Sequence, residues 1–232
     1  MRKTDASEFD AYHQTYDNTV NRAIAFTGLS VDFFTRAKVE YFVELIEALR
    51  PPAGRADVID IGCGVAISHP LLAGRVGRLV GVDVSTTCIA KAADQNPGNE
   101  YAPFDGFNLP YPEESFDVAS AVCVFHHVPV TDRMRLAMDV RRILRTEGLF
   151  VIFEHNPLNP LTMHVVNNCE FDQNAILLRR QETEALLREA GFREVSTRFI
   201  LTIPAAGRML RAVDRLFARI PAGAQYFTVG RA

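Results

Sequence analysis

An apolar run that ends in an acid and two closely spaced glycines constrains this chain more than any other feature. The run is Val58–Gly64 (VIDIGCG), and a second apolar run ends at Asp83, 23 positions after Asp60. A buried strand that enters a glycine turn lets the backbone approach a ligand closely, and a later acid can accept hydrogen bonds from ribose hydroxyls. The pattern therefore predicts an α/β fold with a nucleotide site at the carboxyl ends of two strands.

The spacing of the glycines indicates which kind of nucleotide binds. A dinucleotide fingerprint needs small residues at its first, third and sixth positions, which here are Gly62, Gly64 and Ile67. Ile67 is bulky and β-branched where close packing of helix on strand favours Gly or Ala. The turn therefore argues against a dinucleotide pyrophosphate.

Three segments resemble one family. Asp60–Ala66 (DIGCGVA) resembles the first motif of the class I S-adenosylmethionine-dependent methyltransferases, with Ala66 where a third glycine is frequent, and Gly81–Ser85 (GVDVS) resembles their second motif. Leu109–Asp117 (LPYPEESFD) resembles a loop of the type 11 methyltransferases. The resemblance covers about Ala37 to the end of the chain. It implies a doubly wound, Rossmann-like sheet of seven mostly parallel strands with an antiparallel last strand, and S-adenosylmethionine as the cofactor, released as S-adenosylhomocysteine.

Composition bounds the remaining choices. The chain has 232 residues and a formal net charge of −3, which suits a single domain and gives no general basic field for nucleic acid. The N-terminus lacks the apolar core of a signal peptide, and no apolar run is long enough for a membrane span. We expect a cytoplasmic protein with a small-molecule partner, while its oligomeric state stays open.

The order of predicted elements divides the chain into three parts. They are an N-terminal helical cap or lid (1–31), a cofactor-binding core (32–154), and a substrate-side loop with a closing strand–helix–strand (155–232). Segment 154–175 carries few helix or strand signals, and the fifth strand is expected at 149–153. Four arginines spaced along the penultimate helix, Arg208, Arg211, Arg215 and Arg219, are interpreted first as a solvated face. The other strands are expected at 57–61, 79–83, 100–104, 116–122, 193–202 and 225–229, and the helices at 32–49, 69–74, 85–95, 132–145, 181–190 and 206–219.

The resemblance implies a set of cofactor contacts. The backbone cradle would be Gly62, Cys63 and Gly64, with Asp60 orienting the loop or pairing with the ammonium group. Asp83 would accept from the ribose hydroxyls. The remaining contacts implied are Val84 after the second strand, Asp105, Gly106 and Phe107 at the adenine, Cys123 after the fourth strand, and Tyr16 in the lid.

Each of these assignments has a structural alternative. Asp60 and Asp83 would then only cap their turns, and Asp105 would form an Asp-Gly turn beside a core Phe107. The N-terminal segment that holds Tyr16 would dock by its aromatic residues on the back of the sheet.

Histidines follow two of the central strands, where ligands bind in doubly wound sheets. His126 and His127 follow the fourth strand, and Glu154 and His155 follow the fifth. A neutral imidazole with a pKa near its ordinary value of about 6.5 can remove a proton from a hydroxyl acceptor. The alternative is that these side chains only hydrogen-bond neighbouring loops. We expect no metal site, because adjacent histidines should point apart.

The sequence therefore predicts methyl transfer to a small molecule, with oxygen preferred over nitrogen or carbon as the accepting atom. Two alternatives remain, namely a nicotinamide-dependent oxidoreductase and a non-catalytic protein that binds the cofactor or regulates a partner. A cavity beside Phe125, His127 and His155 would favour the enzyme over the non-catalytic protein.

Overall fold

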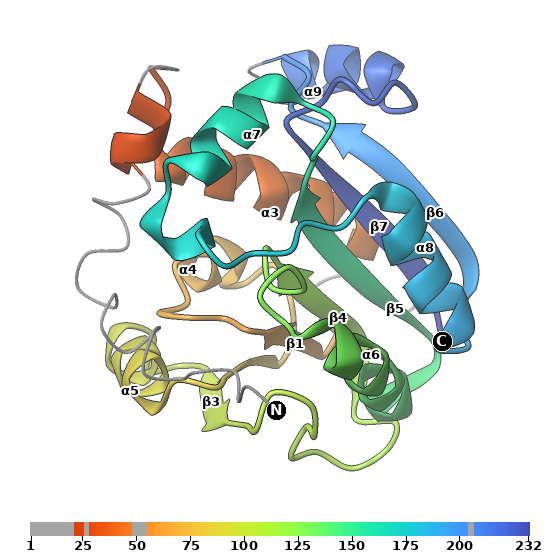
Figure 1. Cartoon of the computed structure of the whole chain (residues 1–232). Coiled ribbons are helices and arrows are strands. Elements are labelled where there is room, and N and C mark those ends of the chain that lie inside the picture. The colour runs from red at the N-terminus through yellow and green to blue at the C-terminus, as the bar shows by residue number, and fades with distance from the viewer. Residues whose placement is uncertain (1–20, 26–27, 48–54, 204–206) are drawn as a thin grey trace.

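The computed structural model describes residues 21–25, 28–47, 55–203 and 207–232, and within them seven strands form a single twisted sheet (Figure 1). The strand order is β3-β2-β1-β4-β5-β7-β6. The strands are β1 (Val58–Ile61), β2 (Leu79–Asp83), β3 (Glu100–Pro103), β4 (Phe116–Val122), β5 (Leu144–His155), β6 (Arg193–Ile200) and β7 (Gln225–Arg231).

Helices cover both faces of this sheet. The helices are α3 (Val31–Glu47), α4 (His69–Leu72), α5 (Thr86–Gln95), α6 (Val130–Ile143), α7 (Pro160–Asn167), α8 (Arg180–Glu189) and α9 (Arg208–Asp214), with short 3-10 turns η3 (Glu170–Asp172) and η4 (Arg215–Phe217).

The pairing of the strands confirms the predicted fold class. Strands β3, β2, β1, β4 and β5 are parallel to one another, whereas β7 runs antiparallel to both β5 and β6. The carboxyl ends of the parallel strands therefore share one edge of the sheet, which α7 crosses in Figure 1. In a doubly wound sheet this edge is where ligands bind.

Alternation along the strands divides the core into two layers. In β1, Ile59 and Ile61 pack in the layer that contains α6 and α8, whereas Val58 packs in the layer that contains α3 and α4. The same alternation separates Phe150 and Ile152 of β5 from their neighbours on the other face. Successive side chains of a strand point to opposite faces, so a central strand that is apolar throughout is buried on both sides.

Segment 154–175 departs from the expectation of an irregular loop, because it contains α7. Asn159 caps this helix: its side-chain oxygen accepts from the amides of Leu161 and Thr162, at 3.0 and 3.1 Å. Pro160 follows at the first helical position, where its missing N–H costs nothing. The Asn-Pro pair is thus a helix start. Strand β5 is also longer than predicted, since it begins at Leu144 and passes through Glu147 in a left-handed conformation with φ of 68°.

Arg211 does not belong to the predicted solvated face, whereas Arg215 and Arg219 are exposed. Arg211 is 8% exposed and contacts Glu40 and Glu44 of α3 through its guanidinium, at 3.1 and 3.5 Å. Arg215 pairs with Glu44 at 2.7 Å. The charges therefore join two helices that are far apart in the sequence, which the spacing of the arginines alone does not show.

Most of the predicted cap lies outside the described residues, and so does Tyr16. Of this segment, residues 21–24 are helical, and the side-chain oxygen of Asn21 accepts from the amide of Val31 at 2.9 Å. The division into three parts stays a prediction. Among the described helices, none is long and apolar enough to cross a membrane.

Candidate active site

The glycine turn after β1 has the left-handed backbone that the sequence suggested. Gly62 and Gly64 have φ of +69° and +54°. A Cβ on Gly62 would lie 2.6 Å from the side chain of Val124, whereas a Cβ on Gly64 would meet nothing within 4 Å. Gly62 is therefore required by packing, and Gly64 leaves open space at the mouth of the turn.

Asp83, at the end of β2, holds the turn in place. Its carboxylate accepts from the amide of Gly64 at 2.8 Å and from that of Ser85 at 2.9 Å. Burial raises the pKa of this carboxyl, and the hydrogen bonds from Ser85 and Gly64 oppose that shift. The acid therefore bridges the two loops between which a bound nucleoside would lie.

Asp60 is satisfied by side chains below the turn. It accepts from the Ser120 hydroxyl at 2.7 Å and contacts His69 Nε2 at 3.3 Å, and His69 Nδ1 in turn contacts the Tyr101 hydroxyl at 2.7 Å. His69 is fully buried. This network joins the end of β1 to β4, α4 and β3, and the role of Asp60 toward the cofactor stays a prediction.

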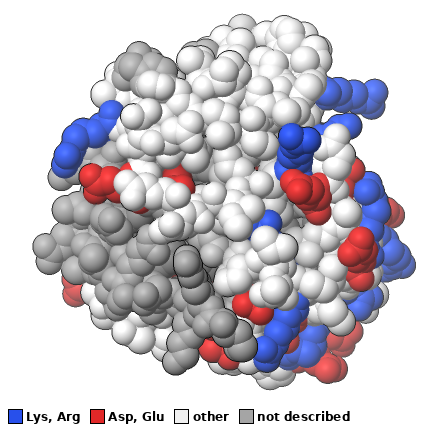
Figure 2. All heavy atoms as spheres, in the orientation of Figure 1, with Lys and Arg blue, Asp and Glu red and all other residues white. Residues whose placement is uncertain are grey.

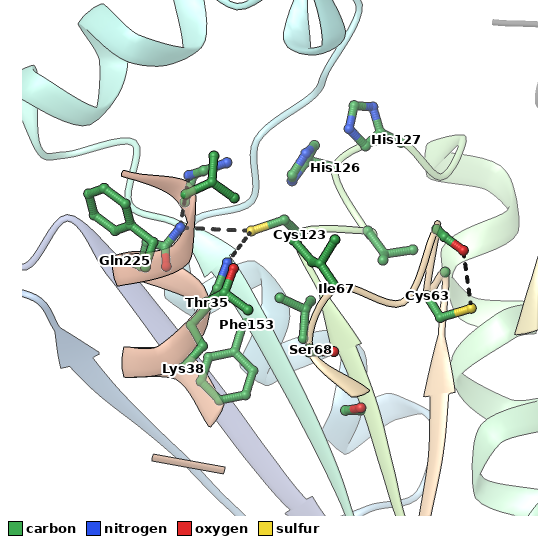
Figure 3. A pocket seen from close by; sticks show the side chains of 18 of the residues that line it. Thr35, Lys38, Cys63, Ile67, Ser68, Cys123, His126, His127, Phe153 and Gln225 are labelled. Atoms are coloured by element: carbon green, nitrogen blue, oxygen red, sulfur yellow. Dashed lines mark hydrogen bonds between the residues drawn. The ribbon is translucent and has the colours of Figure 1, made fainter. Parts of the chain in front are cut away.

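A cavity of about 720 Å³ opens from the glycine turn across the carboxyl edge of the sheet (Figure 3). Its walls include Lys38 of α3, the turn after β4, His155 of β5 and the inner side of α7. Ile67 also lines it rather than packing a helix onto a strand. The volume lies in the range of about 300–1,000 Å³ that is usual for small-molecule sites.

The cavity brings together most of the predicted cofactor residues. Asp105 and Phe107 do not line it: the carboxylate of Asp105 accepts from the amides of Phe107 and Asn108, and the guanidinium of Arg135 lies 3.9 Å from the Phe107 ring centre. Their contact with adenine stays a prediction. The predicted cofactor residues that line the cavity are Asp60, Gly62, Cys63, Gly64, Asp83, Val84, Gly106 and Cys123.

The histidines after β4 converge, so the expectation that they point apart is wrong. Their ring centres lie 4.2 Å apart, and the Nε2 atoms of His126 and His127 lie 3.5 and 3.6 Å from the same oxygen of Asp172. Figure 3 shows both rings on the same side of Cys123. On its other nitrogen, His126 contacts the carboxylate of Glu154 at 2.5 Å. The turn after β4 bends back on itself, with Cys123 at φ of 58°, which places the two rings side by side.

The charges of this cluster are unequal. Burial disfavours a charged ring, but Glu154 and Asp172 outweigh it and raise the pKa of His126 to about 10. Burial, and then the positive His126, lower the pKa of His127 and of His155 to about 4. Although burial opposes it, His126 lowers the pKa of Glu154. Near neutral pH, His126 and Glu154 therefore form a buried ion pair, while His127 and His155 are neutral.

The predicted catalytic side chains differ in their access to the cavity. His126, His127 and His155 line it, but Glu154 is fully buried and does not. Phe125 is also fully buried in the core. The cavity predicted for an enzyme therefore opens beside the two neutral histidines and not beside Phe125.

Two residues of the cavity, Asp172 and Gln225, were not predicted from the sequence. Asp172 belongs to η3 in a segment without a recognisable motif, so no local signal points to it. Gln225 stands opposite His155 in the register of β5 and β7, and its Nε2 lies 3.4 Å from His155 Nδ1. Gln225 and Lys38 both approach the Cys123 sulfur, at 3.8 and 3.9 Å (Figure 3). Knowledge of the strand pairing would have revealed Gln225.

Known proteins resemble this chain in both sequence and fold. Residues 59–152 match the family model described as a methyltransferase domain. The chain is 30% identical over 153 residues to the demethylmenaquinone methyltransferase of Thermotoga maritima, which covers 65% of this chain and 61% of the relative. It is 30% identical over 103 residues to the 2-methyl-6-phytyl-1,4-hydroquinone methyltransferase of Synechocystis sp., and this alignment covers 43% of this chain and 32% of the relative. The chain thus spans less than two thirds of the length of either relative.

A crystal structure from Thermotoga maritima, described as a SAM-dependent methyltransferase and possible histamine N-methyltransferase, shares the fold. It aligns with a TM-score of 0.67 at 20% identity, over 97% of this chain and 98% of that one. The sheet order, the glycine turn and Asp83 define a Rossmann-like domain that binds a nucleoside cofactor. Residues 59–152 thus match a methyltransferase domain, and the chain as a whole has the fold of the class I S-adenosylmethionine-dependent methyltransferases.

The site's own geometry fits that cofactor. The open space at Gly64 is where a side chain would obstruct a ligand, and Asp83 lies across the turn from it. Gly62, Cys63 and Gly64 would hold the amino-acid part, and Asp83 and Val84 the ribose.

Proposed function

We propose that this chain transfers a methyl group from S-adenosylmethionine to an oxygen atom of a small, largely apolar molecule. The observation that carries the proposal is the single cavity that joins Gly64 and Asp83 to the neutral histidines His127 and His155. A cofactor cradle and a polar end for the acceptor therefore share one cavity. Such an arrangement favours catalysis by positioning two reactants.

When bound, S-adenosylmethionine supplies a methyl group that leaves sulfur with its electron pair on sulfur, as the bond from the acceptor oxygen to the methyl carbon forms. The protein's part is to exclude water and to align the acceptor. The acceptor's proton needs a neutral base, which rules out the charged His126. His127 or His155 would take it; both have a pKa near 4, so they are weak bases and positioning carries most of the effect.

The walls of the cavity support an apolar acceptor. Phe33 and Phe34 of α3 and Leu161 and Val165 of α7 all line it. Leu161 is also 61% exposed, and Figure 2 shows few charged residues over the upper part of this face, where α7 and α9 lie in Figure 1. The two relatives named above are methyltransferases whose names specify a hydroquinone and a menaquinone precursor, which are acceptors of this character.

The alternatives explain the structure less well. A nicotinamide-dependent oxidoreductase has no support in the family match, and Ile67 projects to the cavity where a dinucleotide turn needs a small residue. A non-catalytic binding protein would have a filled or closed acceptor region, whereas this cavity continues from the cradle to His155.

The first test is calorimetric titration with S-adenosylmethionine and, separately, with NAD. Gly64→Ala is compared with Gly74→Ala, since both glycines have positive φ and open space at Cβ, but only Gly64 lines the cavity. Both variants should lose about 1 kcal/mol of stability from strain. Only Gly64→Ala should weaken binding of S-adenosylmethionine. Binding of NAD alone, or equal effects of the two substitutions, would overturn the proposal.

The second test concerns the transfer itself. Release of S-adenosylhomocysteine is measured with a panel of phenols, hydroquinones and matched amines. We expect turnover with oxygen acceptors. Turnover with the amines alone would contradict an oxygen acceptor and leave the cofactor assignment intact.

A further inference from the structure

Three side chains at the acceptor end of the cavity converge on one point. They are His126 and His127, from the turn after β4, and Asp172, from η3. Their nearest ligand atoms, two imidazole nitrogens and one carboxylate oxygen, all lie within 4.8 Å of one another. The two histidine–aspartate distances are 3.5 and 3.6 Å. Two ligands of one tetrahedral zinc ion lie about 3.4 Å apart, given metal–ligand bonds of about 2.1 Å.

Among the described residues, one of these ligand atoms lacks a hydrogen bond. His126 Nε2 is buried, and among the described residues nothing forms a hydrogen bond with it. The side chain is 1% exposed, and the ring lines the cavity. A buried polar atom of this kind is costly unless something binds it.

The other nitrogen of His126 is held as metal-binding histidines commonly are. Its Nδ1 contacts the carboxylate of Glu154, which is fully buried. A carboxylate that accepts a hydrogen bond from a metal-binding histidine fixes the tautomer and makes the other ring nitrogen a stronger metal ligand. With Nδ1 donating to Glu154, Nε2 can coordinate a cation that displaces its proton.

The segment that carries Asp172 is anchored over the histidines. The amide of Ile176 donates to the carbonyl of His126 at 2.9 Å, and Arg133 donates to the carbonyl of Ile176 at 2.8 Å. Asp172 is 10% exposed on its side chain and lines the cavity. The third ligand is therefore held by the fold over the turn that supplies the other two.

We propose that His126 Nε2, His127 Nε2 and an oxygen of Asp172 bind a divalent transition-metal ion, with the open coordination position facing the cavity. Two imidazoles and one carboxylate suit zinc or iron(II) better than magnesium or calcium, which prefer oxygen ligands. The open position would take the oxygen of a hydroxyl or phenol, whose pKa the cation lowers. Because His127 would then be a metal ligand, the proton passes to His155 or to solvent. The binding of an acceptor oxygen to the metal rests on the proposed function, whereas metal binding itself does not.

The experiment uses the full chain, treated with EDTA and desalted, and no methyl donor or acceptor is added. Cobalt(II) is titrated and followed by its visible absorption, and zinc is then added in competition. We expect one cobalt ion per chain, displaced by zinc. Asp172→Asn should weaken cobalt binding at least about tenfold, and Glu154→Gln, which alters only the support of His126, by about 10- to 100-fold.

Matched controls separate the site from general effects. Glu170→Gln changes an exposed acid in the same η3 turn, and His164→Gln changes a histidine outside the cluster. Both should bind cobalt as the wild type does. Urea denaturation of each variant reports on folding. Absence of stoichiometric cobalt and zinc in the wild type, or equal binding by Asp172→Asn and Glu170→Gln, would overturn the metal site and identify the cluster as an ion pair alone.

A final step tests the open position. Catechol is added to the cobalt-loaded protein, and a change in the cobalt spectrum is expected from coordination of its oxygen. An unchanged spectrum would overturn the acceptor-binding part only. Because none of these measurements needs methyl transfer, failure of the proposed function and failure of the metal site give different results.

Discussion

Among the described residues, two histidines are buried against carboxylates at the same edge of the sheet, but only one of them keeps a nitrogen without a hydrogen bond. His69 contacts Asp60 with one ring nitrogen and the Tyr101 hydroxyl with the other, and it does not line the cavity. His126 contacts Glu154 with one nitrogen, while the other is without a hydrogen bond and points to the cavity cluster. Burial and a carboxylate partner therefore do not by themselves make a histidine available for binding. What distinguishes the two histidines is whether the second ring nitrogen already has a hydrogen bond.

The largest effect that tests this difference is expected from His126→Phe. The substitution leaves the carboxylate of Glu154 buried without its partner, and breaking a buried ion pair in this way costs about 3–5 kcal/mol. Urea denaturation measures the loss. Adding Glu154→Gln to the variant removes the uncompensated charge and should restore part of the stability. A loss below about 1 kcal/mol would show that the pair is not charged in the folded protein.

A smaller effect is expected from His69→Phe. The phenylalanine keeps the stacking against Tyr101, but it leaves that hydroxyl and one oxygen of Asp60 without their partner. We expect a loss of about 1–3 kcal/mol in the same urea assay, with cobalt binding unchanged. Loss of cobalt binding would instead mean that the two histidines are not separate in function.

The carboxylates beside the glycine turn should differ in the same way. Asp83→Ala removes the acid that faces the nucleoside, and affinity for S-adenosylmethionine should fall about tenfold, or about 1.4 kcal/mol. Calorimetry measures the change, with the exposed Asp94→Ala in the following helix as control. His69→Phe, which disturbs only the support of Asp60, should change the affinity less than Asp83→Ala does. The reverse order would show that Asp60, rather than Asp83, contacts the cofactor.

The smallest effect concerns pH. Asp83 accepts ribose hydroxyls fully only when ionised, and its pKa is raised by burial. Affinity for S-adenosylmethionine should therefore decline on acidification at a higher pH than an ordinary aspartate would allow. Because the raised pKa belongs to the folded state, protonation of Asp83 favours folding as the pH falls, so the decline is separable from acid unfolding. Calorimetry across the neutral and mildly acidic range measures the affinity of the wild type and of Asp83→Asn. The same decline in both proteins would contradict the prediction.

The local sequence determined the parts of this protein that depend on neighbouring residues. The turn at Gly62 and Gly64 was predictable because glycine adopts positive φ whatever surrounds it. The position of Asp83 was predictable because it ends an apolar run that forms a strand. The order of strands and helices predicted the parallel sheet because successive units of this kind pack in one way. The capped start of α7 at Asn159 and Pro160 is also a local signal, although an Asn-Pro pair by itself is equally typical of a loop.

Only the tertiary structure decided the acceptor end of the cavity. Asp172 meets His126 and His127 because a segment more than 40 residues further along the chain folds over their turn, and no spacing along the sequence encodes that contact. Gln225 meets His155 through the register of an antiparallel pair. Which ring nitrogen is satisfied, and hence which histidine is available, depends on such distant partners, since a side chain's hydrogen bonds and charge are set by what the fold places around it.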